Sequence, residues 1–113
     1  MKLIVAFIKP HMLPKVILAL HDLDFLSGLS IWDVRGFGRG RAKGAPDRVA
    51  EGSMDLLPRV RLETVCPDES VERTVGAIER SAHTGLRGDG KIYVIDVEQA
   101  VRISTGERGD AAV

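Results

Sequence analysis

The chain has 113 residues, of which 44% are hydrophobic, and this size and composition predict a single globular domain with one core. Its 16 basic and 16 acidic side chains balance, so net charge gives no reason to expect a nucleic-acid or membrane-surface partner. The one cysteine, Cys66, excludes an intrachain disulfide. The short apolar run before Pro10 is too brief for a signal peptide or a membrane span, which favours a soluble cytoplasmic protein.

The first half of the chain predicts a strand, a helix and a second strand. Residues 2–9 form a continuous apolar run, as expected for a strand buried on both faces or in a subunit contact. A helix over 13–23 follows, because apolar residues recur there at steps of three and four and Pro14 falls in the first turn. After a short turn, residues 31–37 are typical of a second strand.

A long stretch without periodicity comes next. Residues 38–57 are rich in glycine and charge, which favours a solvent-exposed loop. Loops of this length are uncommon inside compact domains and are usually functional or disordered. Arg39, Arg41 and Lys43 make the loop basic, and a protein partner is favoured over nucleic acid because no aromatic residues are interleaved with the charges. A solvated loop without a partner is the alternative.

The second half repeats the order strand, helix, strand. Alternating apolar and charged residues over 59–64 predict a half-buried strand. Asp68 is expected to cap a second helix and Gly85 to end it, and the β-branched and aromatic residues at 92–97 predict the last strand. This order predicts one ferredoxin-like α+β domain over residues 1–113. Its four-stranded antiparallel sheet would carry both helices on one face.

The segment from Gly85 to Lys91 has the spacing G-x-x-x-x-G-K of a phosphate-binding P-loop. A P-loop continues into a Ser or Thr and a helix, whereas this segment continues into a strand, so a P-loop NTPase is excluded. Gly85, Gly88 and Gly90 still allow backbone amides to form an anion-binding nest, with Arg87 and Lys91 supplying charge. Taken alone, such a segment is more often a plain connection than a ligand site.

Five segments in order are similar to the P-II signal-transduction proteins: IKP at 8–10, VRGFGR at 34–39, LPRVRLE at 57–63, TGLRGDGKIYV at 84–94 and AVRISTGERG at 100–109. The resemblance implies a homotrimer of ferredoxin-like subunits that holds adenine nucleotide in the clefts between neighbours. ATP, ADP or AMP would bind there, with or without magnesium. The resemblance also implies that the protruding loop binds and regulates a membrane transporter or a cytoplasmic enzyme, without insertion into the membrane.

Carried onto this chain, the resemblance assigns nucleotide binding to Gly36, Phe37, Gly38, Arg39, Val65, Thr84, Gly85, Arg87, Gly88, Asp89, Gly90, Lys91 and Arg102. A small anionic effector such as bicarbonate is expected at Lys9, Arg39 and Arg59, and the partner-binding residues are Arg41, Lys43 and Arg48. Lysine and arginine neutralise phosphate charge, while glycine amides approach it without a side chain in the way. Residues 84–91 would be the phosphate-binding loop and residues 98–113 the tail that brings Arg102.

Three positions depart from the family pattern and indicate a divergent branch. Ser104 replaces an arginine at the terminal-phosphate end, and Gly40 replaces a glutamine that helps to hold magnesium and 2-oxoglutarate. Gly52 stands where the family often has a uridylylated tyrosine. We therefore expect ADP or AMP to bind at least as well as ATP, 2-oxoglutarate to bind weakly or not at all, and no uridylylation within residues 40–57.

Two alternatives to a nitrogen regulator remain open. One is a P-II-like module that serves bicarbonate, carbon or metal-efflux systems. The other is a small acylphosphatase-like hydrolase, which would need a nucleophile or base beside the anion site. Asp89 is the only candidate in the loop and has no evident histidine partner nearby in sequence, so we expect no enzyme. We expect no metal site either, because His11, His21 and His83 lack the spacing of helical ligands.

Overall fold

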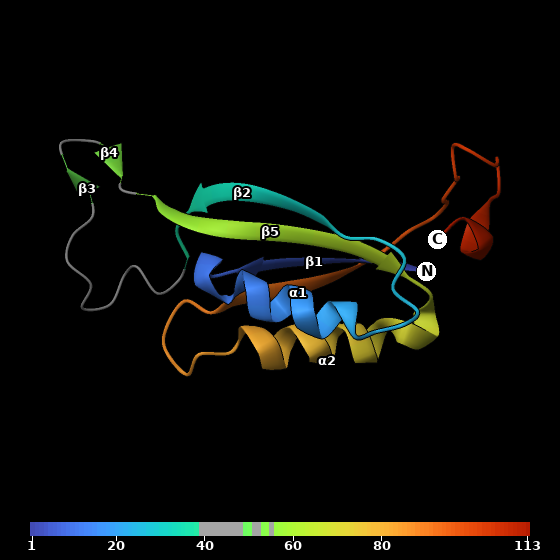
Figure 1. Cartoon of the computed structure of the whole chain (residues 1–113). Helices are drawn as coiled ribbons and strands as arrows, with labels where there is room; N and C mark the ends of the chain where they lie inside the picture. The colour runs from blue at the N-terminus through green and yellow to red at the C-terminus, as the bar shows by residue number, and fades with distance from the viewer. Residues whose placement is uncertain (39–48, 51–52, 55) are drawn as a thin grey trace.

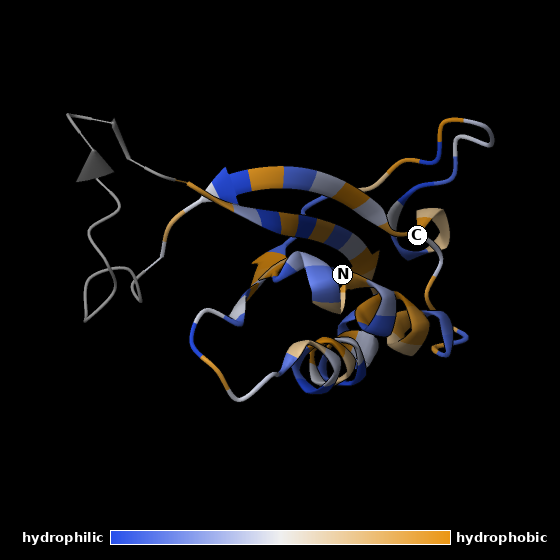
Figure 2. Ribbon diagram, turned by 60° about the vertical axis from the view of Figure 1, so that its left-hand side comes forward, coloured by the Kyte–Doolittle hydropathy of each residue, from blue (hydrophilic) through white to orange (hydrophobic). Residues whose placement is uncertain are grey.

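The structure is a computed structural model that describes residues 1–38, 49–50, 53–54 and 56–113. Its main elements are β1 (Lys2–Ile8), α1 (Leu13–His21), β2 (Ser30–Gly36), β5 (Leu57–Cys66), α2 (Val71–Ala82) and β6 (Gly90–Asp96). The four strands form a sheet in the order β2-β5-β1-β6, with every neighbouring pair antiparallel. Both helices lie on one face of this sheet (Figures 1 and 2). The predicted ferredoxin-like α+β fold is confirmed.

The core lies between the sheet and the two helices. Side chains alternate between the faces of a strand, so every second residue of β1 and β5 points toward α1 and α2, and along β5 buried residues alternate with partly exposed ones. The buried cluster consists of Ile4, Ala6, Ile8, Val16, Leu20, Val60, Leu62, Cys66, Ala77, Ile78 and Ala82. Cys66 is the last residue of β5 and is 1% exposed, so it serves as a small core residue.

None of the described helices covers the other face of the sheet, where aromatic and apolar side chains lie among charged ones such as Arg61 and Lys91. Phe7 and Tyr93 meet edge to face, with ring centroids 6.3 Å apart. The guanidinium of Arg61 lies 5.7 Å from the centroid of Phe7 and 5.8 Å from that of Trp32. Trp32, Tyr93 and Ile95 each remain about half exposed. We call this surface the open face.

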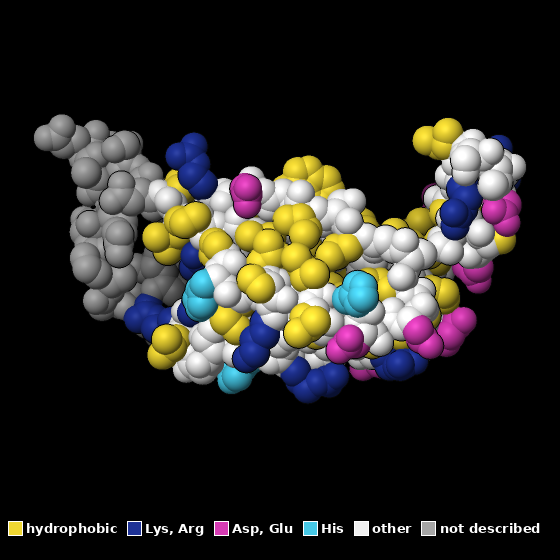
Figure 3. Space-filling model, in the orientation of Figure 1, with side chains coloured by type: hydrophobic (Ala, Val, Ile, Leu, Met, Phe, Trp, Pro, Cys, Tyr) yellow, Lys and Arg dark blue, Asp and Glu magenta, His cyan; other side chains and the backbone are white. Residues whose placement is uncertain are grey.

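Hydrophobic side chains also reach the surface on the helical side. In Figure 3 they gather over α1 and the neighbouring part of β2, where Ile17, Leu18 and Ile31 are exposed. The outward residues of α2 are instead charged, with Glu72, Arg73, Glu79 and Arg80 all exposed. The two helices therefore cover the same core but present different surfaces to their surroundings.

The start of α2 differs from the prediction. Asp68 does not cap the helix, because it lies in a 3-10 turn, Asp68–Ser70, and no side-chain cap hydrogen bond forms at either helical start. Its carboxylate instead pairs with the amino group of Met1 at 2.8 Å. An ammonium group is a stronger partner for a carboxylate than a backbone N–H. Asp68 therefore pairs with the Met1 amine and does not cap the helix.

The long loop holds a feature that the sequence did not predict. Two short strands, β3 (Val49–Ala50) and β4 (Ser53–Met54), pair in an antiparallel manner. The predicted partner-binding residues Arg41, Lys43 and Arg48 lie outside the described residues, as do Arg39, Gly40 and Gly52.

The tail after β6 is folded back on itself by local contacts. Val101 and Arg108 form an isolated antiparallel bridge, and the chain ends in a 3-10 turn, Gly109–Ala112. Figure 1 shows the tail at one end of the sheet, with the loop that follows α2 and the β3-β4 pair at the other. Ile103 in the tail is 99% exposed, so the tail has little packing within its own chain.

Candidate functional site

The glycine-rich loop between α2 and β6 depends on backbone conformations that favour glycine. The helix ends at Ala82, three residues before the predicted stop. Gly85 and Gly88 then adopt φ values of +82°, and Gly90 adopts +114°. A Cβ on Gly90 would lie 1.7 Å from the carbonyl oxygen of Phe7, so the loop enters β6 against the end of β1 at a separation that only glycine allows.

Asp89 closes this loop through hydrogen bonds from Thr84. Its carboxylate accepts one hydrogen bond from the Thr84 N–H at 2.8 Å and another from the Thr84 hydroxyl. The Thr84 hydroxyl oxygen in turn accepts a hydrogen bond from the Leu86 N–H at 3.1 Å. Lys9, just after β1, reaches both groups: its Nζ lies 3.2 Å from Asp89 Oδ1 and 3.3 Å from Thr84 Oγ1.

These contacts fix the charge of Asp89. The hydrogen bonds from the Thr84 hydroxyl and then from the Thr84 N–H hold the pKa of the Asp89 carboxyl well below its usual range, and Lys9 lowers it further. Both kinds of contact favour the ionised carboxylate. The contacts with Thr84 and Lys9 therefore favour the ionised form of Asp89, beside the ammonium group of Lys9.

His83 is a neighbour of Asp89 that the sequence reading missed. The chain leaves α2 at His83 in an extended conformation, which places His83 Nδ1 3.5 Å from Asp89 Oδ2. The expectation that Asp89 has no histidine nearby was therefore wrong. The Thr84 hydroxyl donates its proton to Asp89 and not to His83, so these residues do not form the nucleophile–base pair of covalent catalysis.

Two of the residues predicted to hold a small anion meet beside Gly88. A Cβ on Gly88 would lie 3.2 Å from Arg59 Nη2 and 3.8 Å from Lys9 Cε. Arg59 also donates from Nη1 to the Pro58 carbonyl oxygen at 2.8 Å. Lys9 and Arg59 thus bring two positive charges to one side of the loop, whereas the third residue, Arg39, lies outside the described residues.

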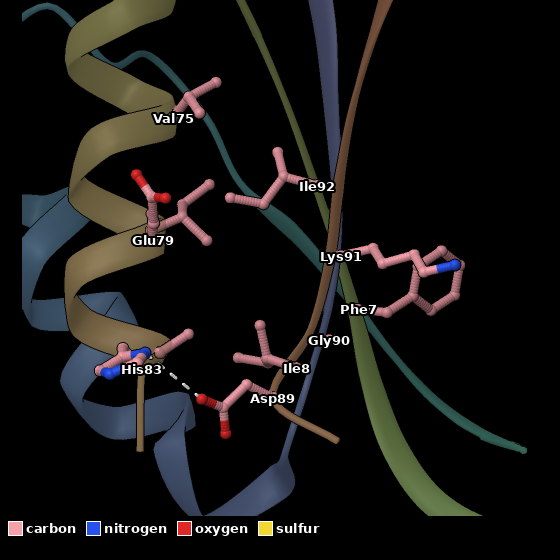
Figure 4. Close-up of a pocket in the computed structure, with 11 residues that line it drawn as sticks. Phe7, Ile8, Val75, Glu79, His83, Asp89, Gly90, Lys91 and Ile92 are labelled. Atoms are coloured by element: carbon pink, nitrogen blue, oxygen red, sulfur yellow. Dashed lines mark ion pairs between the residues drawn. The ribbon is translucent and has the colours of Figure 1, made fainter. Parts of the chain in front are cut away.

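Lys91 points to the open face of the sheet. Figure 4 shows its side chain beside Phe7, directed away from α2, while Ile92 and Glu79 face a pocket between α2 and β6. This pocket has a volume of about 320 Å³ and a mainly apolar floor that includes Ile8 and Ile92. The lysine charge therefore serves the open face and not the pocket.

Within one chain, the residues predicted to bind nucleotide lie at two different ends of the sheet. Gly36 ends β2 opposite Leu57, and Phe37 and Gly38 follow it at the same end as residues 84–91 (Figure 1). Val65 pairs with Leu3 of β1, whereas Lys91 pairs with Phe7 of the same strand. Val65 and Lys91 are therefore about 13 Å apart in the direction of the strands.

Arg102 is farther from the loop still. The tail that carries Arg102 lies at the end of the sheet opposite to residues 84–91 (Figure 1), and Arg102 Nε lies 3.8 Å from Glu107 Oε1. A single chain therefore does not combine Arg102 with Lys91, and a site that uses both must take them from two chains.

The comparisons with known proteins agree with one another. The family model described as nitrogen regulatory protein P-II matches residues 1–107. The nitrogen regulatory proteins P-II of Azospirillum brasilense and Haemophilus influenzae are 46% and 48% identical to this chain. Nitrogen regulatory protein P-II 1 of Escherichia coli is 45% identical. Each match covers 113 residues and 100% of both chains.

These matches extend from β1 into the tail, so they include every described element of the candidate site. No helix within the described ranges is long and apolar enough to cross a membrane. A family match over nearly the whole chain and identities of 45% or more show common descent rather than a shared fold alone. The chain belongs to the nitrogen regulatory protein P-II family, whose members are signal-transduction regulators.

Proposed function

We propose that this protein senses adenine nucleotide as a homotrimer, with each nucleotide held between two neighbouring subunits. The observation that carries the proposal is the division of the site residues within one chain. The glycine loop and Lys91, which pairs with Phe7 near the end of β1, lie at one end of the sheet, and the tail that carries Arg102 lies at the other. A ring of subunits in head-to-tail contact brings the tail of one chain to the loop of the next.

The open face supports assembly. Trp32, Tyr93 and Ile95 expose about half of their surface, and Lys91 lies on the same face. Exposed aromatic and apolar side chains on a sheet face that no described helix covers favour an interaction site. A neighbouring subunit that covers the open face would bury these side chains and would also enclose Lys91 beside the bound phosphates.

The ligand preference follows from the cations present. Lys91, Arg102 and the glycine amides of the loop suit the α- and β-phosphates, because charge-assisted hydrogen bonds are the strong ones. Ser104 supplies no charge for a third phosphate. The protein then binds ADP or AMP at least as well as ATP, and 2-oxoglutarate weakly or not at all. Within the described residues, Arg59 donates to a neutral carbonyl, which leaves its charge for a small anion such as bicarbonate.

The output of this sensor is regulation and not catalysis. The long loop is the part of the chain that binds a target, a membrane transporter or a cytoplasmic enzyme, and the protein works in the cytoplasm. Thr84, Asp89 and His83 lack the arrangement of an activated nucleophile. The comparisons favour nitrogen regulation over carbon or metal-efflux systems, since the matched relatives are named nitrogen regulatory proteins.

Calorimetry combined with light scattering tests this proposal. ADP, AMP and ATP are titrated with and without magnesium and 2-oxoglutarate. Lys91→Ala should weaken ADP binding by about 1.5–3 kcal/mol, the range for hydrogen bonds to charged groups. Lys15→Ala, at an exposed lysine on α1, is the matched control and should leave binding unchanged.

Three results would each remove part of the proposal. A stable monomer in light scattering would remove the site between subunits. Unchanged affinity in Lys91→Ala would make the loop a plain connection. An ATP preference of tenfold or more, about 1.4 kcal/mol, strengthened by 2-oxoglutarate, would contradict the expected ligand preference.

A further inference from the structure

Side chains, rather than a backbone ladder, hold the start of the glycine loop in shape. Asp89 bonds to both the N–H and the hydroxyl of Thr84, five residues earlier, and the Thr84 hydroxyl accepts the Leu86 N–H. We call the paired residues the Thr84–Asp89 clamp. The clamp closes a small ring around Gly85 and Gly88, the two glycines with φ of +82°.

Lys9 attaches this clamp to the sheet. It follows directly after β1, a central strand that pairs with both β5 and β6. Its Nζ contacts Asp89 and the Thr84 hydroxyl together, and its side chain is only 13% exposed. The loop is thereby fixed relative to β5 and β6, the strands that carry the candidate cations Arg59 and Lys91.

The carboxylate of Asp89 has two opposite effects on a bound phosphate. As a negative charge inside a phosphate-binding loop, it repels the ligand. As the acceptor that closes the clamp, it holds the loop ready and so reduces the loss of conformational entropy on binding. Its contacts with Thr84, Lys9 and His83 occupy both carboxylate oxygens, and Lys9 offsets its charge locally, so the second effect dominates.

We propose that Asp89 is a positioning residue, which holds residues 84–91 in the conformation that binds phosphate by closing the clamp with Thr84 and Lys9. The inference rests on the proposed nucleotide site and assigns a role within it. It predicts that removal of a negative charge from a phosphate site weakens phosphate binding, which is the reverse of the simple Coulomb expectation.

The first test is calorimetry of ADP binding to Asp89→Ala and to a matched control, Glu79→Ala. Glu79 lines the neighbouring pocket and is not a member of the clamp, so Glu79→Ala removes a nearby negative charge while Thr84, Asp89 and Lys9 are all retained. We expect Asp89→Ala to weaken ADP binding at least tenfold and Glu79→Ala to change it less than twofold. Equal or tighter binding in Asp89→Ala would overturn the proposal.

A second pair of variants tests the clamp independently if Asp89→Ala does not fold. Thr84→Val removes the hydroxyl that donates to Asp89, whereas Thr84→Ser keeps it. Thr84→Val should lose affinity to a similar extent as Asp89→Ala, and Thr84→Ser should recover most of it. If Thr84→Val and Thr84→Ser bind ADP equally, the hydroxyl does not act through the clamp and the proposal fails.

Hydrogen exchange without nucleotide separates this inference from the proposed function. The Thr84 and Leu86 amides should exchange at least tenfold faster in Asp89→Ala than in the wild type and at wild-type rates in Glu79→Ala. Unchanged exchange in Asp89→Ala would refute the clamp whatever the nucleotide result. A wild-type protein that binds no ADP but shows the expected exchange pattern would refute the nucleotide site and leave the clamp standing.

Discussion

Replacement of Gly90 by alanine should destabilise the protein more than the same change at a glycine that has no atom within 4 Å of an added Cβ. Gly90 is the first residue of β6, opposite Ile8 of β1. A Cβ there would lie 1.7 Å from the Phe7 carbonyl oxygen and 2.8 Å from the Phe7 carbonyl carbon. Both neighbours are backbone atoms of a central strand, so neither can swing aside as a flexible side chain does.

Two terms set the size of the effect. A non-glycine residue held at a φ of +114° is in a sparsely populated conformation, which costs about 1–3 kcal/mol. Relief of the clash requires β6 to move away from β1, an overpacking cost of about 1–3 kcal/mol. Their sum predicts a loss of about 2–6 kcal/mol in the free energy of unfolding, a large part of the stability of a typical domain.

Gly85→Ala and Gly28→Ala separate the two terms. Gly85 has a φ of +82° but nothing within 4 Å of an added Cβ, so only a conformational cost of about 1–2 kcal/mol applies. Gly28 has neither a positive φ nor a neighbour, and its substitution should stay within about 0.5 kcal/mol. Urea unfolding, followed by circular dichroism at one fixed protein concentration, measures all three. A Gly90→Ala variant as stable as Gly85→Ala would show that the approach to Phe7 has no energetic weight.

Two further predictions concern the scaffold. Leu62→Ala removes a side chain that is 0% exposed beneath the helices, and the resulting cavity should lower the free energy of unfolding by about 2–5 kcal/mol in the same assay. The pair between Asp68 and the Met1 amine lowers the pKa of the carboxyl from 3.8 and raises that of the amine from 8.0. Its stabilisation is therefore full between these values, and it is lost as pH falls below 3.8 or rises above 8.0. Asp68→Asn should flatten both limbs of a melting-temperature profile against pH, and an unchanged profile would show that the pair is not formed in solution.

Local sequence patterns predicted the sheet and the helices because the spacing of apolar residues in each segment indicates which side of that strand or helix is buried. The alternation over 59–64 gives β5 its two faces, and the apolar steps after Leu13 give α1 its buried side. The error at Asp68 has a different origin. Its partner is the amino group of Met1, which lies at the far end of the chain, and no local pattern shows that the terminus arrives there. The β3–β4 pair was missed because two-residue strands are too short to show a period.

The sequence predicted which glycines form the candidate site, but it did not predict the contacts between the side chains around them. Gly85, Gly88 and Gly90 stand out in the sequence, and their positive φ angles agree with that reading. The meeting of Lys9 and Arg59 beside Gly88 depends on the register of three strands, which residue order alone does not give. His83 was overlooked because the helix was expected to continue to Gly85, whereas the chain is already extended at His83, which brings its ring to the loop.

Mixed oligomers decide whether the nucleotide site is shared between chains. Lys91 and Arg102 lie at opposite ends of the sheet in one chain, so Lys91→Ala and Arg102→Ala chains should each bind ADP poorly when assembled alone. In a head-to-tail ring, an interface that takes Lys91 from an Arg102→Ala chain and Arg102 from a Lys91→Ala chain contains both native residues.

Random assembly of the two variants in equal amounts restores about a quarter of the sites, because each site draws its two chains independently from the mixture. Denaturation and refolding of the two proteins together, followed by calorimetry, should recover about a quarter of the wild-type high-affinity stoichiometry. Separately refolded samples that are mixed afterwards are the control and should recover none. If each site used Lys91 and Arg102 of the same chain, mixed assembly could not repair either defect, and the absence of any high-affinity sites after joint refolding would refute the shared site.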